Sequence, residues 1–581
     1  MKRLLRYTIL FISIMIIVPG CSKDPLDITP DGRITIKEVF KEDRLIGAYV
    51  NSIYGYIRLY GSVYYPNTML AVFSDEAHDS DDPQDSWANS SQWYGGMLTP
   101  TYNPLDAGTN RESGIKWNGQ YYEDSWAAIR KANVFLTEIK NATMADKGEQ
   151  ARMIAEVKVL RAFFFLELIK MYGGMPIIRE PLPDDFDYTK LKRNSFEECA
   201  AFIAADCNEA IAESALPYRI SIEGERGRFT KAVAHAVKSE ALLFSASKLW
   251  NQNNDLEKWK SAASAAKSAL DALLANDYRL HPNYEKYFQG SSLNSDDKET
   301  IFEIKNPNAV YGGNLFFLHG IPSIDAGKAG ATPSQELVDT YDMANGQQAI
   351  LGYQDADHLK PIINTASGYD DNKPYVGRDP RFYATVWYNQ AFYGNIWGNN
   401  HYVASFIGGI DGLANLRSRT HNGYYLRKFI DPVLRNGNIG NVRWKKYRLA
   451  ELYLNYAEAA NEAYGATSEV YDAIYAIRDR VAMDGLPVGL DVDQMRERIR
   501  RERQVELAFE EHRFWDVRRW KVLDKTDKLT TGIAWTKTGT VFTGKRIVVD
   551  RRLAWDNKFL IFPIPLLEIS RLPAFDQNPG W

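Results

Sequence analysis

Two glutamates, Glu502 and Glu506, stand four residues apart in a segment with helical character, so they share one face of a helix. Two carboxylates held together are what general acid and base catalysis requires. The same segment is rich in arginine, however, and arginine side chains neutralise half-buried carboxylates through paired hydrogen bonds. We therefore predict structural ion pairs here rather than a catalytic pair. The same structural role is predicted for Arg161, Glu451, Glu458, Arg503, Glu510 and Arg513.

Acidic residues also crowd the segment from 75 to 85, where carboxylates could bind calcium. The segment lacks the central glycine and the terminal glutamate of an EF-hand loop, which favours a solvated acidic loop. The eight histidines are scattered, with no His-x-x-x-His spacing and no cysteine pair, so nothing supports zinc. Nucleotide-binding and hydrolase fingerprints are absent from the sequence as well. We therefore predict no metal and no cofactor.

The composition is that of a soluble globular protein, with 45% hydrophobic and 25% charged residues among 581. The net charge of −4 gives no electrostatic basis for nucleic-acid binding, which needs a basic face. The 34 tyrosines and 14 tryptophans either fill an aromatic core or offer stacking surfaces to a ligand. Cys199 and Cys207 are separated by about 12 Å of helical rise, too far for a disulfide, and are predicted to be two buried thiols.

The N-terminus has the pattern of an export signal. After a basic start, residues 7–18 are almost entirely apolar, which is too short for a stable membrane span. The apolar run leads to Gly20-Cys21, a small residue before a cysteine as in a bacterial lipobox, although Pro19 departs from the usual pattern. We predict a signal peptide at 1–20, acylation of Cys21 and a polar tether at 21–32.

Apolar residues recur at three- and four-residue steps over long segments, which predicts helices. The clearest helix covers residues 150–172 and should end at Gly173, because a Gly-Gly pair and then Pro176 stop a helix. Other helices are expected at residues 36–60, 117–140, 195–215, 230–250, 257–276, 445–464, 470–483 and 491–520. Short strands are expected at residues 301–305, 382–388 and 559–565.

Helices of this length in succession predict hairpin repeats of the tetratricopeptide kind. Between residues 277 and 443, glycine, asparagine, proline and aromatic residues replace the helical pattern. Irregular segments of that length tend to carry function. We expect a mainly α protein with one domain at 33–581. Its helical scaffold is predicted at about 33–276 and 445–581, with a loop-rich insertion at about 277–444.

Several motifs resemble those of the SusD/RagB family and follow the expected order along nearly the whole chain. They are EVKVLRAFFF at 156–165 with YGGMP at 172–176, RDPR at 378–381, RLAELYLNYAEA at 448–459 with AIRDR at 476–480, IRRER at 499–503, ELAFE at 506–510, RFWDVRRW at 513–520, FPIP at 562–565 and QNPGW at 577–581. Together with Cys21 they form a specific signature, whereas each motif alone is weak.

The resemblance implies a non-catalytic lipoprotein on the outer face of a Gram-negative outer membrane. It implies four tetratricopeptide-like helical pairs on one side of the fold and an irregular ligand-binding side. It also implies a partner, a SusC-like TonB-dependent transporter, over which the lipoprotein sits as a lid. In that arrangement an oligosaccharide or polysaccharide is captured and passed to the transporter.

A neutral sugar stacks its C–H faces on aromatic rings and exchanges hydrogen bonds with short polar side chains. Three stretches of the chain combine these residue types, at 74–102, 311–317 and 378–402. In the family, the region after the first helix commonly contributes an acidic residue and a stacking tryptophan, so Asp75 and Trp93 are the first candidates, with Trp93 expected at the surface. The other candidates are Trp87, Tyr94, Tyr311, Asn314, Phe316, Arg378, Trp397 and Tyr402.

Two alternatives stay open. The RagB branch suggests the same architecture binding peptides or another nutrient, and a charged, acid-rich pocket would favour that. A helical glycoside hydrolase would need two carboxylates facing a sugar cleft, about 5 Å apart for retention or about 6.5–9.5 Å for inversion.

Overall fold

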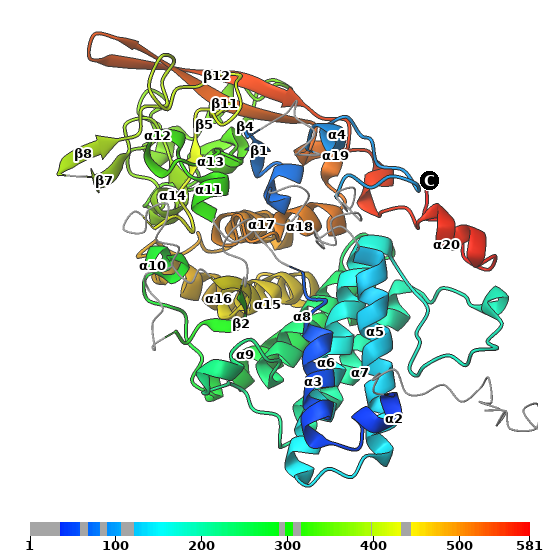
Figure 1. The fold of residues 1–581 in the computed structure, drawn as a ribbon. Helices are drawn as coiled ribbons and strands as arrows, with labels where there is room; N and C mark the ends of the chain where they lie inside the picture. Colours follow the sequence, from blue (N-terminus) through cyan, green and yellow to red (C-terminus); the bar gives the residue numbers. More distant parts are fainter. Residues whose placement is uncertain are drawn as a thin grey trace, which may run out of the picture.

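The computed structural model describes residues 35–58, 68–81, 90–105, 121–289, 297–305, 315–396, 398–431 and 443–581. Long helices gather in one half of the molecule, and short strands and helices make up the other half (Figure 1). The prediction of a mainly α fold with an irregular side and few short strands is confirmed. Within the described residues, no helix is both long enough and apolar enough to cross a bilayer.

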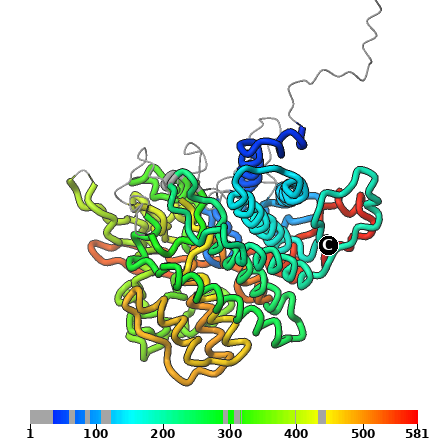
Figure 2. Tube along the Cα trace, turned by 90° about the horizontal axis from the view of Figure 1, so that it is seen from below, coloured from blue at the N-terminus to red at the C-terminus, as the bar shows by residue number. Residues whose placement is uncertain are grey.

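The long helices form one continuous array. Neighbours in the chain pack side by side from α5 to α9, and α15 then packs against α9 although the insertion separates them in sequence. Figure 2 shows the C-terminal helices, in yellow and orange, beside the green segment that contains α9. The helices are α2 (Ile36–Val39), α3 (Asp43–Tyr54), α5 (Tyr121–Glu138), α6 (Lys147–Tyr172), α7 (Phe196–Ala212), α8 (Lys231–Ala246), α9 (Leu256–Ala275), α15 (Leu449–Tyr464), α16 (Ser468–Asp479) and α17 (Val492–Glu506).

Local sequence signals set several of these boundaries. The side chain of Asp146 caps α6 by accepting a hydrogen bond from the Glu149 amide at 3.0 Å. The helix ends as predicted at Gly173, whose φ of 77° is readily adopted only by glycine. In α7, Ser195 and Glu198 form a reciprocal capping box. Cys199 and Cys207, both on α7, are buried free thiols, as predicted.

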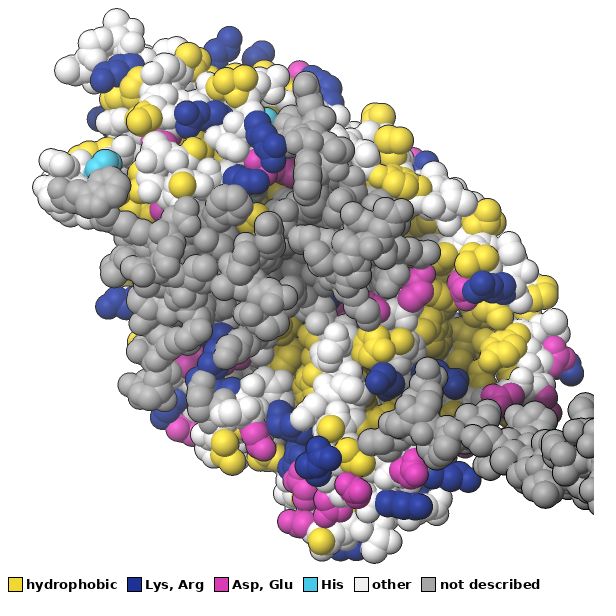
Figure 3. All heavy atoms as spheres, viewed as in Figure 1, with side chains coloured by type: hydrophobic (Ala, Val, Ile, Leu, Met, Phe, Trp, Pro, Cys, Tyr) yellow, Lys and Arg dark blue, Asp and Glu magenta, His cyan; other side chains and the backbone are white. Residues whose placement is uncertain are grey.

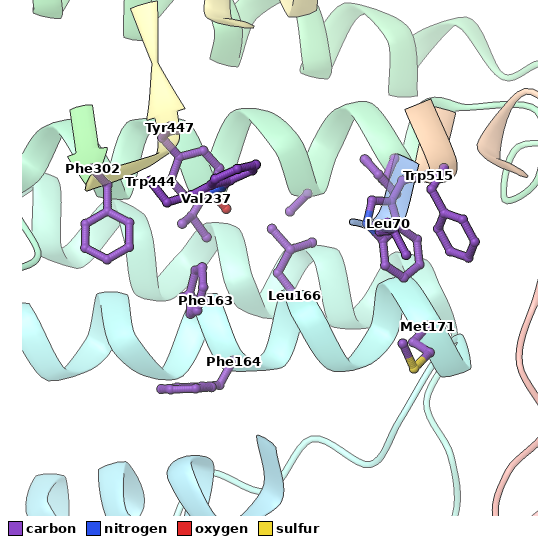
Figure 4. Packing of buried hydrophobic residues seen from close by; sticks show 14 of the residues in the cluster. Leu70, Phe163, Phe164, Leu166, Met171, Val237, Phe302, Trp444, Tyr447 and Trp515 are labelled. Atoms are coloured by element: carbon purple, nitrogen blue, oxygen red, sulfur yellow. The ribbon is translucent and has the colours of Figure 1, made fainter. Parts of the chain in front are cut away.

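The insertion is fastened to the helical array at its base. Its first strand, β2 (Thr300–Lys305), pairs antiparallel with β10 (Arg443–Arg448), the strand that leads into α15. Figure 4 shows Phe302 of β2 and Tyr447 of β10 lying over Phe163 of α6. The ring of Phe163 lies 6.5 Å from that of Phe302 and 6.4 Å from that of Tyr447, both edge-on. The two ends of the insertion are thus held together on the hydrophobic core.

The irregular half consists of two-stranded sheets and short helices. Its antiparallel pairs are β1 (Ala77–Asp79) with β3 (Ala331–Pro333), β4 (Ile350–Tyr353) with β5 (Pro361–Ile363), β6 (Val386–Trp387) with β9 (Tyr425–Leu426), β7 (Phe392–Ile396) with β8 (Asn399–Tyr402), and β11 (Leu529–Thr538) with β12 (Val541–Arg551). Its helices are η1 (Leu70–Phe73), α4 (Ser90–Tyr94), α10 (Tyr284–Phe288), α11 (Leu315–His319), α12 (Pro322–Asp325), α13 (Gln335–Thr340), α14 (Pro380–Thr385), α18 (Arg513–Arg519), α19 (Leu523–Thr526), η6 (Asn557–Leu560) and α20 (Leu566–Arg571).

Several predicted elements were wrong. The helix expected at 36–60 is two helices, α2 and α3, separated by residues 40–42, and the helix expected at 445–464 begins only at Leu449, after β10. Residues 382–388 form the end of α14 and the short β6 rather than one strand, because Pro380 starts a helix capped by Asp379. Residues 559–565 contain no strand, since η6 occupies their start. The helix expected at 491–520 is two helices, α17 and α18, and the turn between them holds Phe509 and Glu511 at positive φ.

The predicted structural ion pairs are confirmed for Glu502, Glu506, Arg161, Glu458, Arg503, Glu510 and Arg513. The prediction is wrong for Glu451, which lies 3.9 Å from His512, forms no ion pair with an arginine among the described residues, and has its pKa raised to about 8 by burial. Glu506 lies fully buried and binds Arg381, Arg448 and Arg480 at 3.0, 2.7 and 2.5 Å. Burial opposes ionisation of Glu506, but the charges of the three arginines outweigh it and hold its pKa well below the ordinary value. Glu502 binds Arg381 and Arg478 in the same network. The pair Glu502 and Glu506 therefore joins the helical array to the irregular half through ion pairs that engage both carboxylates.

Candidate ligand-binding cleft

A cleft of about 650 Å³ opens in the irregular half between α4, the loop at 413–421 and the second half of β12. Its lining combines apolar and polar side chains, as small-molecule sites do. The charged side chains among its described lining residues are those of Asp550 and Arg551, one of each sign. The residues that line it are His78, Ser91, Tyr94, Gly95, Leu413, Ala414, Asn415, His421, Ile547, Val548, Val549, Asp550, Arg551 and Leu553.

Two buried histidines form part of the cleft wall. Nε2 of His421 lies 3.2 Å from the carbonyl oxygen of Leu416, which can only accept a hydrogen bond, so Nε2 carries the proton. Nδ1 of the neutral His421 ring is then an acceptor, and His78 Nε2–H donates to it across 3.2 Å. Burial lowers the pKa of both rings, so the pair is neutral near pH 7. This pair joins β1 to the loop at 413–421.

Tyr94 connects this pair to the rest of the wall. Its ring stacks on His78 with centroids 5.5 Å apart and planes 21° apart. The guanidinium of Arg552 lies 4.4 Å from the centre of the Tyr94 ring, a cation–π contact. The backbone amide of Asp79 donates to the Tyr94 hydroxyl at 3.2 Å. The wall is thus rigid, and of the predicted site residues with described side chains, Tyr94 is the one that lines the cleft.

Asp75 and Trp93 are buried and do not line the cleft. Both oxygens of Asp75 accept hydrogen bonds from Arg513, at 2.8 and 2.7 Å, which closes that carboxylate to a ligand. Trp93 is 1% exposed, and the rings of Phe73 and Phe562 are among its neighbours, each 5.7 Å away. The prediction of a surface ring at Trp93 is wrong, because α4 turns this side chain inward while Tyr94 faces the cleft.

The remaining candidates are dispersed. Arg378 is buried and donates to the carbonyls of Pro374, Val338 and Tyr341, so its role is structural and its prediction as a ligand contact is wrong. Tyr402 is 53% exposed on the β7–β8 hairpin and lies outside the cleft lining. Phe316 is on α11, and its side chain is outside the described part. Trp87, Tyr311, Asn314, Trp397 and Cys21 lie outside the described residues.

Sequence reasoning missed the β11–β12 hairpin, which supplies residues 547–551 of the cleft wall. A signal was present, because Thr, Val and Ile are frequent from 530 to 549 and Gly539-Thr540 form the two-residue connection of a hairpin. His78, Asn415 and His421 were also missed. The sequence gives no sign that the two histidines are in contact, because 343 residues separate them.

Glu76, next to Asp75, gives a pH-dependent prediction. One of its oxygens accepts a hydrogen bond from the Phe509 amide at 3.0 Å, and the other has no partner among the described residues. Burial raises the pKa of Glu76 from 4.5 to about 8. The neutral acid is therefore favoured by folding. The stability that it contributes is complete below pH 4.5 and is lost as the pH rises toward 8.

We expect Glu76→Gln to have the same melting temperature as the wild type at pH 4.5 and a higher one at pH 8, because glutamine keeps the acceptor and cannot ionise. Thermal unfolding of both proteins between pH 4.5 and 8.5 measures this. A melting-temperature difference that stays constant over that range would show that Glu76 does not titrate there.

Charges of both signs are interspersed on the visible described surface, with no basic face (Figure 3). In the described chain, no group of three or more His, Cys, Asp and Glu side chains is placed to hold a metal ion.

Comparison with known protein families identifies this architecture. The family model described as "SusD family" matches residues 286–581, which is half of the chain. The chain belongs to the SusD family. A second model, described as "Starch-binding associating with outer membrane", matches residues 74–243 of this SusD-family protein. The resemblance seen in the motifs is thus confirmed.

Individual relatives span nearly the same length as this SusD-family protein. SusD-like protein P2 of Formosa agariphila is 22% identical over 536 residues, which are 89% of this chain and 91% of the relative. A crystal structure of a SusD-like protein from Bacteroides fragilis is 28% identical with a TM-score of 0.75, covering 94% of this chain and 98% of that one. A laminarin-binding SusD-like protein has the same fold, with 24% identity and a TM-score of 0.60 over 93% of this chain and all of its own.

Proposed function

We propose that this protein is a lipid-anchored surface protein that binds a glycan in the cleft and passes it to a SusC-like TonB-dependent transporter of the outer membrane. Family membership supports glycan binding, since one matching model is described as starch-binding and a structural relative as laminarin-binding. The observation that best supports a site in the cleft is its lining, in which aliphatic side chains lie beside the short polar side chains of Ser91 and Asn415.

The lining also separates this proposal from its alternatives. Asp550 is the single carboxylate among the described lining residues, so the pair of acids that glycoside hydrolysis uses is not assembled there. One acid and one base do not make the acid-rich pocket that favours a peptide. A non-catalytic glycan receptor agrees best with this lining.

A binding screen tests the function. The mature chain without residues 1–22 is titrated calorimetrically with neutral and acidic oligosaccharides and with peptides. We expect dissociation constants in the micromolar-to-millimolar range for a neutral glycan, because shallow stacking sites supply roughly 4–8 kcal/mol. Asn415→Ala should weaken that binding about fivefold, the value of about one hydrogen bond.

The matched control is Asn253→Ala, an exposed asparagine between α8 and α9 that lines no part of the cleft. It should bind as the wild type does. Binding of peptides with no glycan binding would refute the proposal, and equal affinity of the Asn415 variant and the wild type would move the site away from the cleft.

The anchor gives a separate prediction. Acylation of Cys21 follows from the lipobox-like sequence, and several acyl chains hold a soluble domain durably on a bilayer. We expect Cys21→Ala to release the protein from the outer-membrane fraction while the folded domain binds glycans unchanged. Cell fractionation measures this, and an equal membrane share for the variant would place the anchor elsewhere.

A further inference from the structure

The β7–β8 hairpin projects from the irregular half, away from the helical array (Figure 1). One of its faces is anchored in the protein. Tyr393 and Ile396 are buried there, and the ring of Tyr393 stacks on Trp387 with centroids 5.0 Å apart. Below the hairpin, the Val403 amide donates to the Ala391 carbonyl at 2.9 Å. The projection is therefore a supported element whose orientation is fixed by packing.

The other face carries two exposed aromatic rings. Phe392 and Tyr402 are direct partners across the two strands, and they are 51% and 53% exposed. Their ring centroids lie 5.4 Å apart, with planes inclined by 55°. Neither ring contributes to the hydrophobic clusters of the core. Leaving large aromatic surface in water forgoes burial energy, so a paired exposed set is typical of an interaction site.

The hairpin differs in charge from the rest of the chain. Residues 389–403 include no Lys, Arg, Asp or Glu, in a protein whose composition is 25% charged. The left-hand projection in Figure 3 accordingly shows white, yellow and cyan but hardly any dark blue or magenta. Instead, Asn400, which shares a strand face with Tyr402 two residues away, and its cross-strand partner Asn395 present exposed amides. A phosphate backbone or an anionic membrane requires cations, which this surface does not offer.

Exposed rings flanked by neutral amides match an uncharged sugar chain, whose C–H faces stack on aromatics and whose hydroxyls pair with amides. We propose that the outer face of the β7–β8 hairpin is a second contact for a neutral glycan, separate from the cleft. This inference rests on the proposed function. None of the hairpin's described residues lines the cleft, so the two contacts act on different parts of one long chain. Two linked contacts raise the affinity for a polymer above that for a short oligosaccharide.

The test variant is Phe392→Ala/Tyr402→Ala. Its matched control is Tyr464→Ala/Tyr475→Ala, which removes two rings of similar exposure, 56% and 49%, from α15 and α16. Both variants and the wild type are run in native gels containing soluble starch, laminarin, xylan or mannan, and are then titrated with trisaccharides of whichever polymer retards the wild type. Melting temperatures verify that all three proteins are folded.

We expect the hairpin variant to lose tenfold or more in affinity for the polymer, by analogy with base stacking on aromatic side chains, and to keep its affinity for the trisaccharide. The control should match the wild type in both assays. Equal retardation of wild type and hairpin variant would overturn this inference and leave the cleft proposal intact. Retardation of the wild type by no polymer would instead overturn the proposed function. A change in oligomeric state of the hairpin variant, measured by light scattering, would identify the face as a protein contact and also overturn it.

Discussion

Replacing Arg448 with methionine should prevent folded protein from accumulating. Arg448 is 1% exposed and donates to three carboxylates, those of Glu299, Glu506 and Glu510, at distances of 2.6–2.8 Å. It also donates to the Glu506 carbonyl at 2.8 Å. Removing one partner of a single buried ion pair costs about 3–5 kcal/mol because the other charge stays buried and unpaired. Here three acids lose a partner at once, against a total stability of roughly 5–15 kcal/mol.

The variant Arg448→Lys tests whether the charge of Arg448 or the geometry of its guanidinium group stabilises the protein. Lysine keeps the charge but lacks the planar fork that reaches all three acids, so we expect a folded protein with a clearly lowered melting temperature. Arg571→Met is the control, since Arg571 is 64% exposed in its ion pair with Glu568 and such surface pairs contribute at most about 1 kcal/mol. Soluble yield and thermal unfolding are the measurements. A stable Arg448→Met protein would show that the network tolerates loss of its central cation.

Trp93→Ala should destabilise the protein by about 3–5 kcal/mol, as truncation of a core tryptophan does. The ring fills the space between η1, α18 and the C-terminal segment, with Phe514 at 5.7 Å and Phe559 at 6.1 Å in addition to its other aromatic neighbours. Because no face of the ring reaches the cleft, affinity for a glycan should be unchanged at temperatures where the variant is folded. Denaturant unfolding and calorimetric titration of the same sample measure both quantities.

Trp93→Phe is the matched variant, because phenylalanine retains most of the buried apolar volume and should recover most of the lost stability. An unchanged unfolding free energy together with a tenfold loss of glycan affinity would contradict this placement. It would restore the surface role that the polar surroundings of Trp93 in the sequence had suggested.

The helical array was predictable because its signals are local. Apolar residues at helical spacing and the Gly173 stop each lie within a few residues of the helices that they determine. The ion pairs of Glu502 and Glu506 are different, because their partners include Arg381, more than 120 residues away, and not the arginines beside them in the sequence. The helix that was predicted in one piece at 491–520 failed because its break depends on Phe509 and Glu511, which tertiary contacts hold at positive φ. Neither phenylalanine nor glutamate is a residue type that predicts a positive φ.

The site was harder to predict because it depends on contacts between distant segments. The sequence made Asp75, Trp93 and Tyr94 candidates in one stretch, but it could not show which side chains turn inward. The carboxylate of Asp75 is occupied by hydrogen bonds from Arg513, 438 residues further along the chain, and no local sequence pattern indicates that pairing. Neighbouring residues Trp93 and Tyr94 point to the core and to the cleft for the same reason, the packing around a five-residue helix.

The contact between α9 and α15 has a kinetic consequence. As the chain is synthesised, α5 to α9 are complete while the helix that covers the outer face of α9 has not yet been made, because residues 276–448 come first. Closing so long a loop has a large entropic cost and slows folding, so the pairing of β2 with β10 and the docking of α15 should be late events. Until then Trp259, Ala262 and Ala263 of α9, which share a hydrophobic cluster with α15 in the folded protein, stay accessible to other unfinished chains. A nascent molecule is therefore most vulnerable to self-association after α9 has formed and before Leu449 arrives.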